Sequence, residues 1–462
     1  MTTTKRLVER LFLPVDIASL AVFRILFGSV MCVGAIRFAL SGWVDTLFIR
    51  PRHFLTYYGM GWVHPWPGWG MYLHYGAMAL AAGCLAAGFY YRVSVLAFFV
   101  LFTYAQLIDI SNYLNHYYLA VLLAGLLVVL PAGQAWAFDT WRRPERRQSF
   151  VPAWVVYLLR VQVGVVYVYA SLAKFTADWL LEALPLRLWL RARTHFPVIG
   201  PWLSEQWVAY VMSWSGFVYD GCIVLLLLVA RTRPFAYAAV VIFHGLTYAF
   251  FDIGMFPFIM VTSTLIFFSP SWPRRLWCWV RRWKFVPESP STNPLRPSSQ
   301  RGRAWVVAAL GLYALTQVLF PLRHYAYPGD VLWNEQGMRF SWKVLVREKN
   351  GSVTYHVRER RSGRRYDISP HDYLTWAQVS EMSSQPDLIL KLAHLIADDL
   401  KHQGRGPVEI RAEAWASLNG RPAMLMLDET RDLVPVRDDL WPADWIRRGP
   451  TDAAYNGEWV RR

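Results

Sequence analysis

The chain contains about nine long apolar runs, and this feature limits the available folds more than any other. The runs lie at roughly 17–40, 71–91, 93–110, 117–137, 153–175, 207–230, 235–251, 255–270 and 304–321. About 20 apolar residues suffice to cross a bilayer as a helix, which satisfies its own backbone polar groups within lipid. The runs therefore predict a mainly α protein, a multipass bundle of about nine transmembrane helices. They exclude a simple soluble chain and a disordered one.

The basic residues between these runs predict how the chain is oriented. If the N-terminus is cytoplasmic, the loops on its side hold 18 basic residues and the opposite loops hold six. Cytoplasmic loops carry the excess of Lys and Arg in membrane proteins. We therefore expect a multipass protein of the cell (inner) membrane. Residues 1–321 contribute +15 of the net charge of +16, so this charge is a topological signal and not a nucleic-acid-binding surface.

The composition changes after Phe320. Residues 322–462 hold 21 basic and 20 acidic residues, which alternate with Tyr, Val and Ile, and helical periodicity returns only near 386–402. This pattern predicts a small mixed α/β domain on the extracytoplasmic side, following a transmembrane domain over 1–321. Within 271–303, a stretch rich in Pro, Ser and Arg is typical of a linker, here on the cytoplasmic side.

The run 153–175 carries a polar stripe. At helical spacing one face presents Arg160, Gly164, Tyr167, Ser171, Lys174 and Asp178. Lipid cannot satisfy these groups, so we expect this face to point into the bundle. Lys174 lies near the outer end, where spacing leaves two interpretations open. It either snorkels to the headgroups or pairs with Asp178, or it is a desolvated amine that acts as a base.

Four further ionisable side chains lie in or beside the apolar runs. His116 precedes the fourth run on the same side as Lys174, His244 lies inside the seventh, and His324 follows the last. Each histidine is either a hydrogen-bonded or interfacial side chain or a functional group. Their spacing is not that of a zinc site, so we expect no metal. Arg24, deep in the first run, requires an acidic partner or backbone carbonyls.

Five sequence blocks resemble the vitamin K-dependent gamma-carboxylase family. In chain order they are NYLNHYYL around His116, AKFTADW at 173–179, FHGLTYAFFDIGMFPFIM at 243–260, FPLRHYAY at 320–327 with WNEQGMRFSWKVLV at 333–346, and SLNGRPAMLMLDETRDL at 417–433. The blocks occur in the family's order and run through most of the chain. The chain is thus similar to the shorter bacterial members, which include the horizontally transferred transmembrane domain type.

The resemblance implies a membrane lyase that forms a carbon–carbon bond. It couples oxygenation of reduced vitamin K to carboxylation of glutamate side chains in a peptide or protein. In this reaction a deprotonated quinol reacts with O2 to give a strong base and finally the epoxide, and that base removes a γ-proton before CO2 adds. The implied cofactor is phylloquinol or menaquinol, with O2 and CO2 as co-substrates. The implied partners are the glutamate substrate, the quinone and membrane lipid, without nucleic acid.

The resemblance also implies which residues act, and it assigns them to the two expected domains. The transmembrane domain would be catalytic and the outer domain would bind substrate. The implied catalytic residues are Lys174, His116, Asn115 and His324, with Lys174 as the base. The implied glutamate-site residues are Trp333, Ser341, Trp342, Gly337 and Met338. The implied quinone-site residues are His244, Tyr167 and Met255.

The chain departs from the animal members in several places. Ala173 stands where they carry a second lysine, and Gly337 and Met338 stand where they carry Leu and Tyr. The animal disulfide has no counterpart, and the outer domain is shorter, which affects peptide carboxylation more than epoxidation. Two alternatives therefore stay open. One is a quinol epoxidase without carboxylation, and the other is a non-catalytic quinone-binding, lipid-binding or transport protein, which would tolerate Lys174→Ala.

Overall fold

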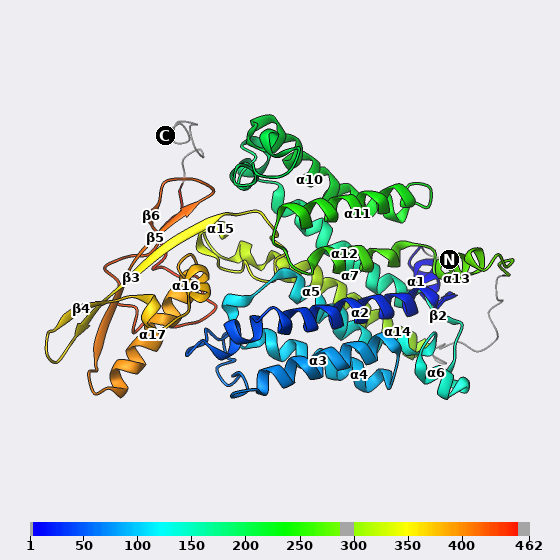
Figure 1. The fold of residues 1–462 in the computed structure, drawn as a ribbon, viewed down its shortest axis with the longest axis horizontal. Coiled ribbons are helices and arrows are strands. Elements are labelled where there is room, and N and C mark those ends of the chain that lie inside the picture. Colours follow the sequence, from blue (N-terminus) through cyan, green and yellow to red (C-terminus); the bar gives the residue numbers. More distant parts are fainter. Residues whose placement is uncertain (1–2, 287–299, 451–462) are drawn as a thin grey trace.

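The chain forms a long helical body with a smaller sheet-containing part at one end (Figure 1). The computed structural model describes residues 3–286 and 300–450. This arrangement confirms the prediction of a mainly α fold with a small mixed C-terminal part. Of the predicted linker, 271–303, the described portion contains a short helix, α13 (Trp272–Val280), and residues 287–299 lie outside the description.

Each of the nine predicted spans contains a helix. These helices are α2 (Ala18–Leu40), α3 (Gly70–Ala87), α4 (Tyr91–Leu107), α5 (Asn115–Val129), α7 (Ala153–Lys174), α10 (Gln206–Leu228), α11 (Arg233–Phe250), α12 (Phe256–Thr264) and α14 (Gln300–Leu319). Within the described chain, α2, α7, α10 and the helix from Gln300 to Ala326 are long and apolar enough to cross a membrane. Helices α4, α5 and α12 are apolar but shorter, so the number nine stays a prediction.

The C-terminal part is an antiparallel sheet covered by helices. Its strands are β3 (Lys349–Glu359), β4 (Arg365–Ile368), β5 (Val408–Leu418) and β6 (Met424–Leu425), in the order β4-β3-β5-β6. Side chains along β5 alternate between the buried face and the outer face, as expected for a sheet with one covered face. The predicted helix near 386–402 is α17 (Pro386–His402), which packs on β5 and confirms that prediction.

Short elements complete the chain. They are α1 (Thr3–Leu11), β1 (Pro14–Asp16) paired with β2 (Phe150–Pro152), α6 (Phe138–Arg142), α8 (Ala177–Leu181), α9 (Leu186–Arg191), α15 (Val331–Asn334) and α16 (Trp376–Met382). Helices α1 and α13 lie at the end of the body that is remote from the sheet (Figure 1). Helices α8 and α9 share one apolar core with the C-terminal part, so the two parts pack together directly.

Small residues bring α7 and α10 close together. A Cβ at Gly221 would lie 3.0 Å from Ser171 Oγ, and one at Gly164 would lie 3.5 Å from a methyl of Val224. Small residues at helix interfaces let backbones approach in membrane bundles. This close approach fixes which side chains of the two helices can meet.

Arg24 is fully buried in α2 and finds its partners in backbone carbonyls. Its guanidinium donates to the carbonyl oxygens of Ala132 at 2.8 Å, Ala135 at 3.1 Å and Trp136 at 2.6 Å. Of the two partners that the sequence left open, an acid or carbonyls, the structure selects carbonyls. The arginine thereby ties the first long helix to the turn that follows α5.

Candidate active site

Lys174 ends α7, and its amine lines an apolar cavity of about 90 Å³ inside the helical body. The walls come from α7 to α12, and residues 344–345, which follow α15, complete them. Aromatic side chains, including Trp179, Phe243 and Phe256, make up much of the lining. Such an environment excludes water and strengthens any electrostatic interaction within it.

The partner of Lys174 is Asp220, from the middle of α10. The Lys174 Nζ atom lies 2.8 Å from Asp220 Oδ2, and the two side chains are only 8% and 5% exposed. The same amine donates to the Ala170 carbonyl at 3.3 Å and lies 5.3 Å from the centre of the Trp179 ring. The interpretation that Lys174 pairs with Asp178 is therefore wrong. Lys174 ends α7 and the chain then breaks direction before α8, so the two side chains do not share a helix face.

Tyr167 and His244 line the same cavity as Lys174. The Tyr167 hydroxyl lies 3.2 Å from His244 Nε2 and 3.2 Å from Thr264 Oγ1. The Nδ1 atom of His244 is buried and has no hydrogen-bond partner among the described groups. Two of the three expected quinone-site residues thus meet the expected base at one cavity.

The third expected quinone-site residue, Met255, does not line the cavity of Lys174. Its side chain lines a separate small cavity beside α2, where its sulfur lies 3.6 Å from an Arg37 nitrogen. A Cβ at Gly34 would lie 3.4 Å from Met255 Cγ, so the thioether packs tightly on α2. The structure does not bring Met255 into the cavity that Lys174 lines.

His116 and Asn115 open α5 behind the same aromatic wall. The His116 ring is buried and lies 6.0 Å from the ring of Phe256, whose other neighbour is His244 at 5.5 Å. The Nε2 atom of His116 has no partner among the described groups. Asn115 accepts from the Tyr113 hydroxyl at 2.9 Å and donates to the Lys343 carbonyl at 3.3 Å. The hydrogen bond from Asn115 to Lys343 therefore links α5 to the segment 333–346.

The expected glutamate-site residues lie on one folded segment, 333–346. Trp342 is buried and stacks on Tyr118 of α5 with ring centres 4.9 Å apart, and its indole nitrogen has no partner. Ser341 donates to the carbonyl of Met338, which closes a tight turn. Trp333 donates instead to the Arg447 carbonyl at 2.8 Å and belongs to the core of the C-terminal part.

His324 and Gly337 fix the start of this segment. The backbone of Gly337 has a φ of +75°, and a Cβ there would lie 2.8 Å from His324 Cα. Only glycine fits this left-handed conformation at such close approach. His324 is mostly buried, and its Nδ1 lies 2.8 Å from the Pro321 carbonyl oxygen.

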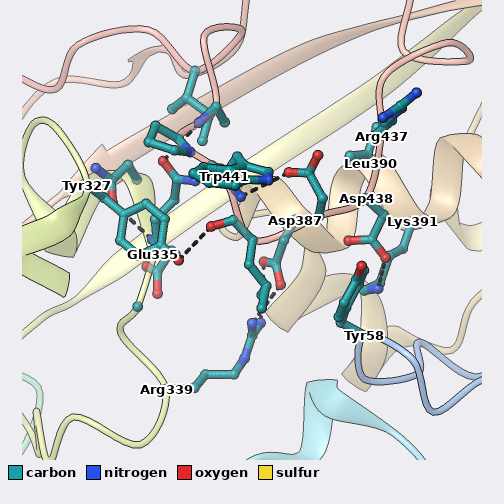
Figure 2. A pocket seen from close by; sticks show the side chains of 18 of the residues that line it. Tyr58, Tyr327, Glu335, Arg339, Asp387, Leu390, Lys391, Arg437, Asp438 and Trp441 are labelled. Carbon is teal, nitrogen blue, oxygen red and sulfur yellow. Dashed lines mark hydrogen bonds and ion pairs between the residues drawn. The ribbon is translucent and has the colours of Figure 1, made fainter. Parts of the chain in front are cut away.

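A second, larger cavity of about 760 Å³ opens on the outer side of the same segment. Figure 2 shows Arg339 directed at Asp387 of α17 and Lys391 directed at Asp438, with Tyr58, Tyr327 and Trp441 around them. The Arg339–Asp387 pair is 2.6 Å long. This outer cavity is lined by Gly337 and Phe340, whereas the inner cavity is lined by Val344 and Leu345. One short segment therefore separates an outer cavity that holds several charged side chains from the apolar cavity of Lys174.

Two contacts of the candidate site were not predicted from the sequence. Asp220 is the sole acidic residue between 206 and 228, and an acid within an apolar span is itself a signal of function. The second is a clamp between two family blocks, in which Arg421 and Asn419 hold Asp178. Arg421 reaches both carboxylate oxygens, at 2.7 and 2.8 Å, and Asn419 donates at 2.7 Å. Nothing in the spacing of residues so far apart could have indicated it.

A buried charge cluster beneath the segment makes the stability of the C-terminal part pH-dependent. Burial lowers the pKa of Lys349 to about 8, although the Glu335 carboxylate nearby opposes this shift. The unfolded chain keeps this lysine protonated up to about pH 10.4. The free energy of unfolding is therefore expected to rise by about 2–3 kcal/mol as the pH rises from 8 to 10. Thermal denaturation at several pH values measures this slope, and Lys349→Met should remove it.

Among the described residues, the fold and the site combine four helices that are long and apolar enough to cross a membrane, a sheet-containing C-terminal part and a buried lysine–aspartate pair. Residues 12–272, more than half of the chain, match the HTTM domain. Residues 302–452 match the lumenal domain of vitamin K-dependent gamma-carboxylase. The chain belongs to the vitamin K-dependent gamma-carboxylase family, as the five blocks indicated. No solved structure matches the chain.

Proposed function

We propose that the protein couples oxygenation of a reduced naphthoquinone to carboxylation of glutamate side chains. The observation that carries this proposal is the position of segment 333–346, which touches the outer cavity and also closes the cavity of Lys174. Two substrates that approach from opposite sides, a lipid-soluble quinol and a water-soluble peptide, would meet at this segment.

The side chains around the inner cavity match a naphthoquinol in kind, and the cavity of about 90 Å³ must widen to admit the fused ring. Its walls are apolar and aromatic, as a fused ring requires, and it carries the Lys174 amine and the Tyr167–His244 pair. The buried His116 Nε2 and His244 Nδ1 atoms, which have no hydrogen-bond partner among the described groups, offer further hydrogen bonds nearby. When bound, the quinol supplies, by reaction with O2, the strong base that glutamate carboxylation requires.

The roles of the chain's own residues follow from this placement. In its neutral form the Lys174 amine would take the proton of the quinol hydroxyl, at a site whose apolar walls exclude water. Tyr167 and His244 would orient the ring, and His116 with Asn115 would stabilise developing charge from the side of α5. The unpaired indole N–H of Trp342 would donate to the glutamate carboxylate, and His324 would support the turn or handle its proton.

The proposal is tested by supplying purified protein with reduced vitamin K, O2, labelled bicarbonate and a glutamate peptide. We expect both epoxide and label in the peptide. Epoxide without label would reduce the function to that of a quinol epoxidase. Absence of both products would favour a non-catalytic quinone-binding, lipid-binding or transport protein.

Trp342→Phe should weaken peptide use alone, because it keeps the aromatic stack on Tyr118 and removes only the free N–H. We expect the peptide KM to rise about tenfold, as for loss of a hydrogen bond to a charged group. Epoxidation without peptide should stay unchanged, and Ser341→Ala should have the same pattern. Trp376→Phe, at an exposed tryptophan, is the matched control. Equal loss of epoxidation and carboxylation would contradict a glutamate-site role.

A further inference from the structure

The inner cavity contains one isolated charge pair. Among the described residues that line it, Lys174 and Asp220 are the only charged ones. The other titratable side chains that face this pair are Tyr167 from α7 and His244 from α11, with Tyr219 from α10 beside them. The described lining residues of α12 and of positions 344–345 are apolar. Asp220 is therefore the one counter-charge that the described lining places beside the Lys174 amine.

The geometry of α10 is built around the lysine side chain. Gly216 lies one turn before Asp220, and a Cβ there would lie 3.9 Å from Lys174 Cε and 3.8 Å from the Trp179 ring. The lysine stem thus crosses α10 where that helix has no side chain, and its amine ends at the carboxylate, 2.8 Å away. A buried ion pair is costly to form and very costly to break, because a lone buried charge has no compensation. An ion pair within an apolar span therefore indicates a function other than stabilising the fold.

We propose that Asp220 is the positioning residue of the base. It holds the Lys174 amine at the cavity wall, and it supplies the counter-charge for the ammonium that forms when the amine takes the substrate proton. The state that accepts is the neutral amine beside the Asp220 carboxylate, and the ion pair is the state left after the transfer: the substrate O–H bond breaks, an N–H bond forms at Lys174 Nζ, and the electron pair stays on the substrate oxygen. The identity of the proton donor rests on the proposed function, whereas the control of the amine by Asp220 does not.

The first test needs no quinol. Acetic anhydride acylates an amine only in its neutral form, so its reaction with Lys174 in the resting protein, followed by peptide mass spectrometry, reports how much of this amine is neutral. Asp220→Asn removes the counter-charge, and we expect labelling at neutral pH to become at least about tenfold faster. Asp220→Glu keeps the charge and should label at the wild-type rate. Asp220→Ser is a second uncharged variant and should behave like Asp220→Asn if the latter does not fold.

The matched control is Asp16→Asn. It makes the same chemical change at a mostly buried carboxylate that lies 2.9 Å from Arg274 of α13 and does not line the inner cavity. It should leave the labelling of Lys174 unchanged. Unchanged labelling in both uncharged variants at Asp220 would overturn the proposal. Faster labelling in Asp220→Glu or Asp16→Asn as well would also overturn it, because it would not reflect a changed charge beside the amine.

The second test measures epoxidation. Asp220→Asn should lower kcat about 100-fold, at the lower end of what a positioned base contributes, with little change in the quinol KM. Asp220→Glu should recover kcat to within about tenfold of wild type. A raised KM with unchanged kcat would contradict the positioning role. If the wild-type protein forms no epoxide, the proposed function fails, and the labelling result still decides whether Asp220 controls the amine.

Discussion

Lys174→Arg is expected to lower the rate of quinol epoxidation by a factor of about 10²–10⁴ and to leave the fold intact. Arginine keeps the positive charge and can still pair with Asp220, so the buried carboxylate stays compensated. Its guanidinium remains protonated in proteins and cannot accept the quinol proton. The substitution therefore separates the function of a base from that of an ion-pair partner, which Lys174→Ala does not.

The measurement is the rate of epoxide formation by the purified variant, beside its thermal denaturation temperature. Lys391→Arg is the matched control, because it makes the same change at an ion pair with Asp438 in the outer cavity. It should leave epoxidation at the wild-type rate. An active Lys174→Arg enzyme would mean that another group takes the proton, and it would remove the basis for assigning the base to Lys174.

Arg421→Ala is expected to have the largest effect on stability and to uncouple the two half-reactions. The side chains of Arg421 and Asp178 are only 12% and 18% exposed, so truncation leaves a largely buried carboxylate without its cation. We expect a loss of about 2–4 kcal/mol in the free energy of unfolding. Carboxylation should fall more than epoxidation, because the clamp joins the C-terminal domain to α8, next to Lys174.

The clamp also has a predictable pH dependence. Burial raises the pKa of Asp178, but hydrogen bonds from Arg421 and Asn419 and the charge of Arg421 outweigh burial and hold it below its ordinary value. Its contribution to stability is therefore present at neutral pH and is lost as the pH falls through the lowered pKa. Denaturation curves of wild type and Arg421→Ala should converge in strong acid.

The matched control for the clamp is Arg431→Ala. Arg431 lies in the same sequence block, but its contact with Asp444 is 3.8 Å long and largely exposed. Such a pair contributes about 0–1 kcal/mol, so this variant should stay close to wild type in stability and in epoxidation. Equal effects of the two substitutions would mean that the Arg421–Asp178 contact has no special role.

The sequence alone predicted the fold class and the family. Helices occupy all nine apolar runs because apolar runs of this length can satisfy their backbone only as helices, and each run is a local property of the chain. The alternation of charged and β-branched residues after Phe320 likewise predicted the sheet, and the periodicity near 386–402 predicted α17. Lys174 stood out for the same reason, as a charge within an apolar span.

What each of these groups contacts was decided only by the tertiary structure. The spacing of four residues predicted that Asp178 could pair with Lys174. The helix instead ends between them, at the turn from α7 to α8, and Asp178 binds Arg421, 243 positions away in the sequence. Close packing of α7 on α10 through glycines brings Asp220 to the lysine instead, 46 positions away. Helix period and composition describe one element at a time. The pairing of buried charges depends on how elements cross, and that is set by packing between segments distant in the chain.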